Sequence, residues 1–194
     1  MKKLIIPFLL LAGTCISACN GNNETNESTA NTDSASSSAI DTSNNNAGSA
    51  MVDEKVMDFA KDAATGGMME VELGNMAQQK AKSQKVKDFG KMMVDDHTKL
   101  NNEFKDIASK KSIDLPATVT DDQRKEIDDL SKKSGADFDK AYVDMMIEDH
   151  KKDIAAFKKA EGDVSDNDVK NFITNSLPTL QKHLDAIEAI KANK

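Results

Sequence analysis

Apolar residues recur every three or four positions through four long stretches of the chain, with charged residues between them. This is the periodicity of amphipathic helices that bury one face. Four such helices bury their apolar faces most simply as an antiparallel four-helix bundle, so the pattern predicts an all-α fold. The stretches cover about residues 53–82, 84–111, 136–160 and 166–192.

A connection of about two dozen residues separates the second of these helices from the third. Asp114-Leu115-Pro116 ends the second helix, and Thr120-Asp121 suits the cap of a short polar helix over residues 122–133. The connection is long enough to cross the whole bundle. We therefore predict a four-helix bundle with a long, partly helical connection between its second and third main helices.

Three short segments interrupt the helical pattern. Gly66-Gly67 lies within the first helix, where each glycine costs roughly 1 kcal/mol relative to alanine. The pair predicts either a kink or the close approach of a neighbouring helix. Pro178 is expected to kink or divide the fourth helix, and Glu161-Gly162-Asp163 to end the third.

Each of the four helices carries one metal-ligand type of residue within its apolar face. The segment MMVDDH at residues 92–97 returns 53 positions later as MMIEDH at residues 145–150, and the histidine of each copy falls on the buried side. The last helix carries the third and final histidine of the chain. Imidazole suits zinc, copper and iron, so this set predicts a site for one transition-metal ion. The predicted ligands are Glu70, His97, His150 and His183.

Two methionines are secondary candidates for the same site. Met93 and Met146 each lie one helical turn before a histidine, and a mixed thioether and imidazole site in the cell envelope suits copper(I) best. Methionines at such positions more often fill the core. The acids next to the histidines, Asp96 and Asp149, are expected to support the ligands or to face solvent.

Counting residues from the turns places Glu70 and His97 in one layer of the bundle. His150 and His183 match less well, by about one turn. Either Pro178 absorbs this difference or His183 lies in another layer. A Glu70–His97 pair would also satisfy both groups without a metal, in which case the histidines would only specify packing.

The sequence offers little support for catalysis. It has no nucleophile motif, no glycine-rich phosphate loop and no dinucleotide fingerprint. A di-iron site of the ferritin kind needs Glu-x-x-His on two helices, but Val94 and Ile147 stand three positions before His97 and His150. An enzyme is therefore not the expected function. A metal-dependent enzyme is a third hypothesis, which an open cavity beside the histidines would favour.

The first residues of the chain predict a secreted lipoprotein. Residues 1–18 combine two lysines with an apolar run that is too short to span a membrane, as in a signal peptide. Ile16-Ser17-Ala18-Cys19 resembles the lipobox of bacterial lipoproteins, in which the cysteine is lipidated. We expect a lipid-anchored protein in the envelope of a Gram-negative-type bacterium, at the outer membrane or facing the periplasm.

The segment after Cys19 predicts a tether that precedes one folded domain. Residues 19–50 are mostly Asn, Ser, Thr, Ala and Gly, which cannot bury enough surface to fold, and residues 51–194 form the domain. A net charge of −7, one Tyr and no Trp argue against nucleic-acid binding. The lipid is the expected membrane contact, and the sequence does not identify protein partners, which stay unknown.

Four segments carry a family resemblance across Val52 to Ala189. They are Ala63–Gly74, Val86–His97, Phe138–His150 and Leu177–Leu184. On these motifs the folded part resembles a bacterial family catalogued as domain of unknown function 4142. The resemblance implies an envelope location and a ferritin-like four-helix fold, and it implies no established activity.

Two functions follow from these observations. The leading hypothesis is a lipid-anchored envelope bundle that binds copper, zinc or iron in a sequestration or stress role. The alternative is a non-catalytic structural or interaction module of the envelope, whose core histidines only specify packing.

Overall fold

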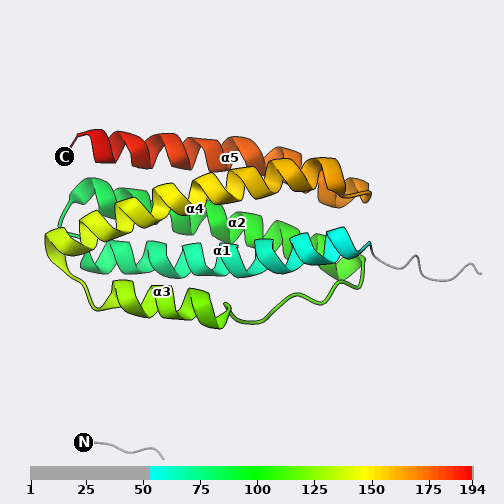
Figure 1. Ribbon diagram of the computed structural model, residues 1–194, viewed down its shortest axis with the longest axis horizontal. Helices are drawn as coiled ribbons and strands as arrows, with labels where there is room; N and C mark the ends of the chain where they lie inside the picture. The colour runs from blue at the N-terminus through cyan, green and yellow to red at the C-terminus, as the bar shows by residue number, and fades with distance from the viewer. Residues whose placement is uncertain (1–52, 194) are drawn as a thin grey trace, which may run out of the picture. The chain divides into compact units, whose positions relative to one another are not determined.

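The computed structural model describes residues 53–193 of the chain. In this part the chain forms five helices (Figure 1): α1 (Glu54–Lys80), α2 (Gln84–Lys110), α3 (Asp121–Ser131), α4 (Gly135–Asp163) and α5 (Asn167–Ala192). The predicted all-α fold is confirmed. None of these helices has the length and apolar composition that a membrane span requires. The predicted signal peptide, the lipidated Cys19 and the tether lie outside the described residues.

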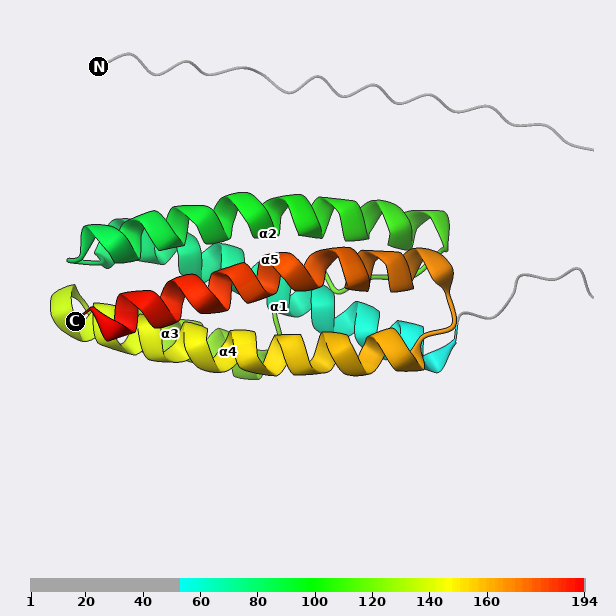
Figure 2. The same ribbon diagram turned by 90° about the horizontal axis from the view of Figure 1, so that it is seen from above.

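The four long helices form a bundle with one long crossover connection. Helix α1 packs against α2 and α4, while α5 packs against α4 and α2. The connection that contains α3 runs back along the whole bundle, so α4 starts at the end where α2 starts and runs in the same direction (Figures 1 and 2). Ferritin-like bundles have one such crossover. The predicted architecture is therefore confirmed, including the partly helical connection.

Helix α3 begins at the predicted cap. Thr120 accepts a hydrogen bond from the Gln123 backbone N–H at 3.2 Å, and the Gln123 side chain accepts one from the Thr120 N–H at 2.9 Å. This reciprocal capping box satisfies two N–H groups that the helix leaves free. A bidentate ion pair of Arg124 with Glu72, at 2.7 and 3.1 Å, links α3 to α1.

One of the expected interruptions ends its helix and another does not. Helix α4 continues through Gly162 and ends at Asp163, so the predicted stop at residues 161–163 is confirmed, although the expected last helical residue, about 160, was three residues early. It ends where Val164 turns into extended backbone and buries its side chain in the core. Pro178 is exposed within α5, which runs unbroken past it because buried residues such as Ile173 and Leu180 hold both sides. The proline therefore does not divide the helix.

Glycines allow α1 and α2 to approach closely. Helix α1 is continuous through Gly66-Gly67, and a Cβ atom on Gly67 would overlap the Asn101 side-chain amide of α2. The close-approach alternative is thus confirmed for Gly67. Further along, a Cβ on Gly74 would lie 2.7 Å from the carbonyl oxygen of Gly90, and the reverse distance is also 2.7 Å.

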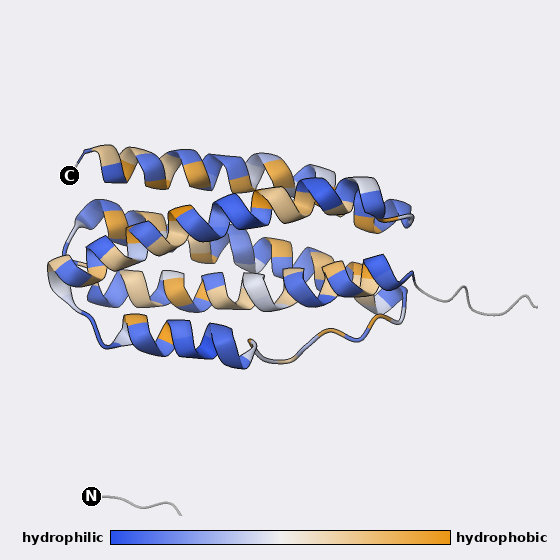
Figure 3. Ribbon diagram, viewed as in Figure 1, coloured by the Kyte–Doolittle hydropathy of each residue, from blue (hydrophilic) through white to orange (hydrophobic). Residues whose placement is uncertain are grey.

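The apolar faces of the helices (Figure 3) form two clusters, one toward each end of the bundle. On α2, Met93 belongs to the first cluster and Phe104 to the second. His97 lies between them and is buried. Polar side chains at this level are enclosed by apolar residues on both sides, which raises the energetic importance of their partners.

Candidate metal centre

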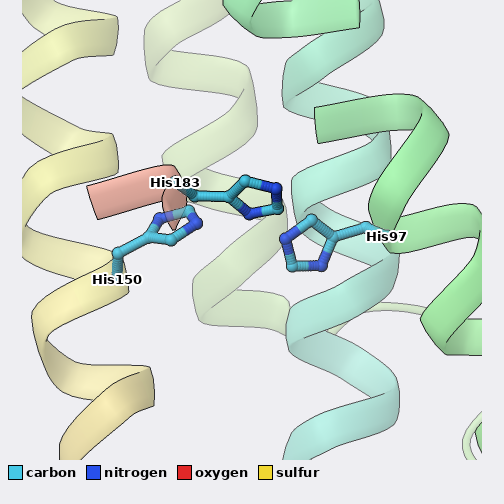
Figure 4. Close-up of side chains that lie close together, drawn as sticks. All are labelled: His97, His150 and His183. Carbon is cyan, nitrogen blue, oxygen red and sulfur yellow. The ribbon is translucent and has the colours of Figure 1, made fainter. Parts of the chain in front are cut away.

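Three helices bring the three histidines together. His97 of α2, His150 of α4 and His183 of α5 each offer a ring nitrogen, and these three atoms lie within 4.8 Å of one another. Their ring centroids are 5.2 to 6.0 Å apart, and Figure 4 shows the three rings close together, each from a different helix. All three are buried. His183 therefore shares the layer of the other two, and the alternative that it lies in another layer is wrong.

Each ring is held by an acceptor at one of its nitrogens. Carbonyl and carboxylate oxygens accept hydrogen bonds, so a neutral ring that donates one carries its hydrogen on that nitrogen and a lone pair on the other. The contacts are 2.8 Å from His97 Nδ1 to Glu70 Oε2, 3.0 Å from His150 Nδ1 to the Met146 carbonyl oxygen, and 2.9 Å from His183 Nε2 to Asp96 Oδ2.

The second nitrogen of each ring has no hydrogen-bond partner among the described residues. These atoms are His97 Nε2, His150 Nε2 and His183 Nδ1, and all three are buried. A buried polar atom without a partner costs about 1–3 kcal/mol. One cation bound by the three rings would satisfy these lone pairs together.

Glu70 lies beside two of the three histidines. One carboxyl oxygen contacts His97, while the other, Oε1, is buried without a hydrogen-bond partner in the described part. Oε1 lies 3.6 Å from His150 Nε2, which is too long for a hydrogen bond. Two ligand atoms of one tetrahedral zinc ion are about 3.3 Å apart, so the separation of Glu70 Oε1 and His150 Nε2 is close to that of two ligands of one ion. The predicted shared layer of Glu70 and His97 is confirmed, although Glu70 is outside the three-nitrogen group.

Burial controls the protonation of these residues. It lowers the pKa of His97 and of His183 to about 4, and it also lowers the pKa of His150. Burial raises the pKa of Glu70 to about 7, against the attraction of His150. The imidazoles are therefore neutral near pH 7, which is the state in which they bind metals.

An acid that the sequence analysis missed completes this region. Asp153 lies one turn after His150 on α4 and is half-buried. Burial, followed by the negative charge of Glu70, raises the pKa of Asp153 to about 8. The signal was its position three residues after a histidine, which shares a helix face. Among the acids next to the histidines, Asp96 supports His183, whereas Asp149 is half-buried with its pKa raised by burial to about 7.

The two methionines pack in the core. Met93 and Met146 are fully buried within the larger apolar cluster. Met146 reaches the site through its main-chain carbonyl, which holds the His150 ring. A metal-binding role for either thioether stays a prediction.

An open cavity of about 230 Å³ leads to this site between the helices. Its lining includes the buried Glu70 and His97 and the half-buried Asp153, together with exposed charged residues such as Lys55 and Asp58. His150 and His183 do not line it. This is the feature that the hypothesis of a metal-dependent enzyme requires, because it gives a small molecule access to the histidine layer.

Comparisons with known proteins identify a family without indicating an activity. The family model described as "Domain of unknown function (DUF4142)" matches residues 41–190. This confirms the resemblance expected from the sequence motifs. The chain matches no curated protein and no solved structure.

Proposed function

The chain belongs to the DUF4142 family, whose description names no activity, and we propose from the geometry of its site that the domain binds one transition-metal ion. The ligands are His97, His150 and His183. One observation carries this proposal: each buried ring is anchored through one nitrogen, leaves the other without a partner among the described residues, and offers a nitrogen within 4.8 Å of those of the other two rings. Metal-binding histidines nearly always donate their second N–H to a carboxylate, a carbonyl or water.

The size and chemistry of the site support zinc, copper or iron. Nitrogen ligands of one tetrahedral ion are about 3.3 Å apart, so three nitrogens within 4.8 Å need only small ring movements to converge. Glu70 Oε1 lies near enough to act as a fourth ligand. Three imidazoles and a carboxylate suit these three metals and move the preference away from purely soft ions. Sulfur from Met93 or Met146 would restore a preference for copper(I).

In the cell, the proposed role is sequestration of the metal or protection against stress in the envelope. The support for this location is the sequence of residues 1–19, with its signal-like run and lipobox-like Cys19. A lipid on Cys19 would hold the domain at the membrane, while the tether would let it stand away from the surface.

Metal retention tests the proposal directly. The purified protein is incubated with zinc, copper and iron in turn, desalted, and analysed for bound metal; about one ion per chain is expected with at least one of them. A His97→Ala, His150→Ala double variant should retain almost none. The control is Thr98→Ala, Lys151→Ala, which changes the exposed neighbours on the same helices. Unchanged stoichiometry in the histidine variant would exclude these ligands.

The strength of metal binding should also depend on pH. Below its pKa of about 7, Glu70 holds a proton that it can donate to His97 Nδ1, and the His97 hydrogen then occupies Nε2, the nitrogen that would otherwise bind the metal. Above that pH the carboxylate accepts the Nδ1–H and leaves Nε2 free. One linked proton predicts affinity about tenfold weaker at pH 6 than at pH 8.

Chelator competition at both pH values measures this dependence. Glu70→Gln removes the titrating group, so its affinity should change much less over the same range. The histidines contribute little there, because the pKa of His97 and of His183 is about 4. Asp153, whose pKa burial raises to about 8, titrates in the same range, so Asp153→Asn is measured beside Glu70→Gln. An equally steep dependence in Glu70→Gln would show that another group takes up the proton.

A structural module is the second candidate, and the contact between Glu70 and His97 favours it. This contact of 2.8 Å pairs two buried polar groups without a metal. Under this alternative the chain retains none of the three metals, and the histidines serve only to specify the packing of the bundle.

A further inference from the structure

Small residues on two helices leave open the cavity that reaches the histidine layer. Ala63 and Gly66 of α1 line one side, and Ala156 and Ala160 of α4 line another. A Cβ atom on Gly66 would meet no other group within 4 Å. Larger side chains at these positions would occupy the space, so the cavity depends on a few identifiable residues.

The lining of the cavity combines aromatic side chains with polar groups of the histidine layer. The four phenylalanines that line it are Phe59, Phe104, Phe157 and Phe172. The polar groups are Glu70, His97 and Asp153, and Glu70 Oε1 and His97 Nε2 are buried without a hydrogen-bond partner in the described structure. A ligand that fits is mainly apolar with one polar atom directed inward.

The charged residues that line the cavity are of both signs and so do not favour a cation over an anion. Lysines and aspartates both line it, and Lys159 is paired with Asp163 on the same helix. A volume of about 230 Å³ is well above the roughly 10–15 Å³ that a single water molecule requires, so a small molecule has room. Charge and size together favour a small neutral molecule.

From the proposed metal site, on which this inference rests, we propose that the cavity delivers a small neutral ligand with a nitrogen or oxygen donor to an exchangeable position on the metal. Three histidines leave the fourth position of a tetrahedral ion to Glu70 or to an incoming donor that displaces it. The cavity reaches the site at His97 and Glu70, so this position lies on the Glu70 side. The carboxyl groups of Glu70 and Asp153 line the cavity and can form hydrogen bonds with the incoming molecule. A centre with an exchangeable ligand is of the kind found in enzymes, whereas purely structural sites are closed.

Pyridine is a suitable neutral probe. The purified protein is loaded with cobalt(II), whose visible absorption reports its ligands, and titrated with pyridine at pH 8. We expect a saturable change in the cobalt bands with no loss of cobalt. In Gly66→Phe, which fills the cavity, half-saturation should need at least tenfold more pyridine. In Gly162→Phe, where a Cβ also meets open space but outside the cavity, it should stay within about twofold of wild type.

A second pair of variants tests the same inference if Gly66→Phe does not fold. Ala156 and Ala155 are neighbouring exposed residues of α4, and only Ala156 lines the cavity. Ala156→Phe should weaken pyridine binding as Gly66→Phe does, and Ala155→Phe should not. If cobalt is retained but its absorption bands do not change with pyridine, the inference about the cavity is overturned, while the proposed metal site is still supported. Equal pyridine binding in the cavity and control variants would also overturn it, and failure to retain cobalt would contradict the metal site itself.

Discussion

Saturating zinc is expected to raise the unfolding midpoint of the purified protein by about 10–15 °C. An ion that binds only the folded state stabilises it by about 4 kcal/mol at a concentration 1,000 times its dissociation constant. For a domain of this size each kcal/mol raises the midpoint by roughly 3 °C. The ion would also satisfy the three buried nitrogens that lack partners among the described residues. Thermal melts followed by circular dichroism, with and without zinc, measure the shift.

Variants separate specific binding from a general effect of zinc. His150→Ala should abolish most of the shift, because it removes a ligand whose ring is fully buried. Lys151→Ala changes the exposed neighbour and should keep the full shift. If the wild-type midpoint stays constant up to millimolar zinc, and also with copper or iron, the result would support the alternative in which the histidines only specify the packing of the bundle.

The sequence was sufficient to find the residues of the layer because helical periodicity is local. Glu70 and the three histidines stood out as polar residues inside apolar faces, and any bundle turns these faces toward one another. The level of His183 was harder to predict. Counted from their loop, His150 and His183 still differ by about one turn, yet their ring centroids are 5.3 Å apart. Counting residues ignores the reach of side chains.

Among the supporting residues, Asp96 was expected from its place beside His97 and holds His183, whereas others were not predicted because their roles depend on contacts between distant segments. Asp153 lies at the edge of its apolar face, where an acid usually meets solvent, and only its approach to Glu70 makes it part of the site. Asp139 is similar: it is buried and accepts hydrogen bonds from the backbone of Lys82 and Ser83, each at 2.9 Å. The cavity is also a tertiary feature, created where small residues of α1 and α4 fail to fill the space.

Gly74→Ala is expected to lower the free energy of unfolding by about 2–3 kcal/mol, the usual cost of overpacking a core. The added methyl group would lie 2.7 Å from the carbonyl oxygen of Gly90, a backbone atom that cannot turn aside. Helices α1 and α2 would have to separate beside the histidine layer. Helix propensity alone predicts the opposite sign, a gain of about 1 kcal/mol. Urea denaturation measures the difference.

Gly66→Ala is the matched control, because its methyl group would enter open space on the same helix. It should be neutral or more stable than wild type. Gly90→Ala should be as harmful as Gly74→Ala, since its methyl group would lie 2.7 Å from the Gly74 carbonyl oxygen. The double variant should cost less than the sum of the single variants, because both methyl groups force apart the same pair of backbones. Additive losses would mean that the two glycines act at independent contacts, contrary to the close approach of α1 and α2.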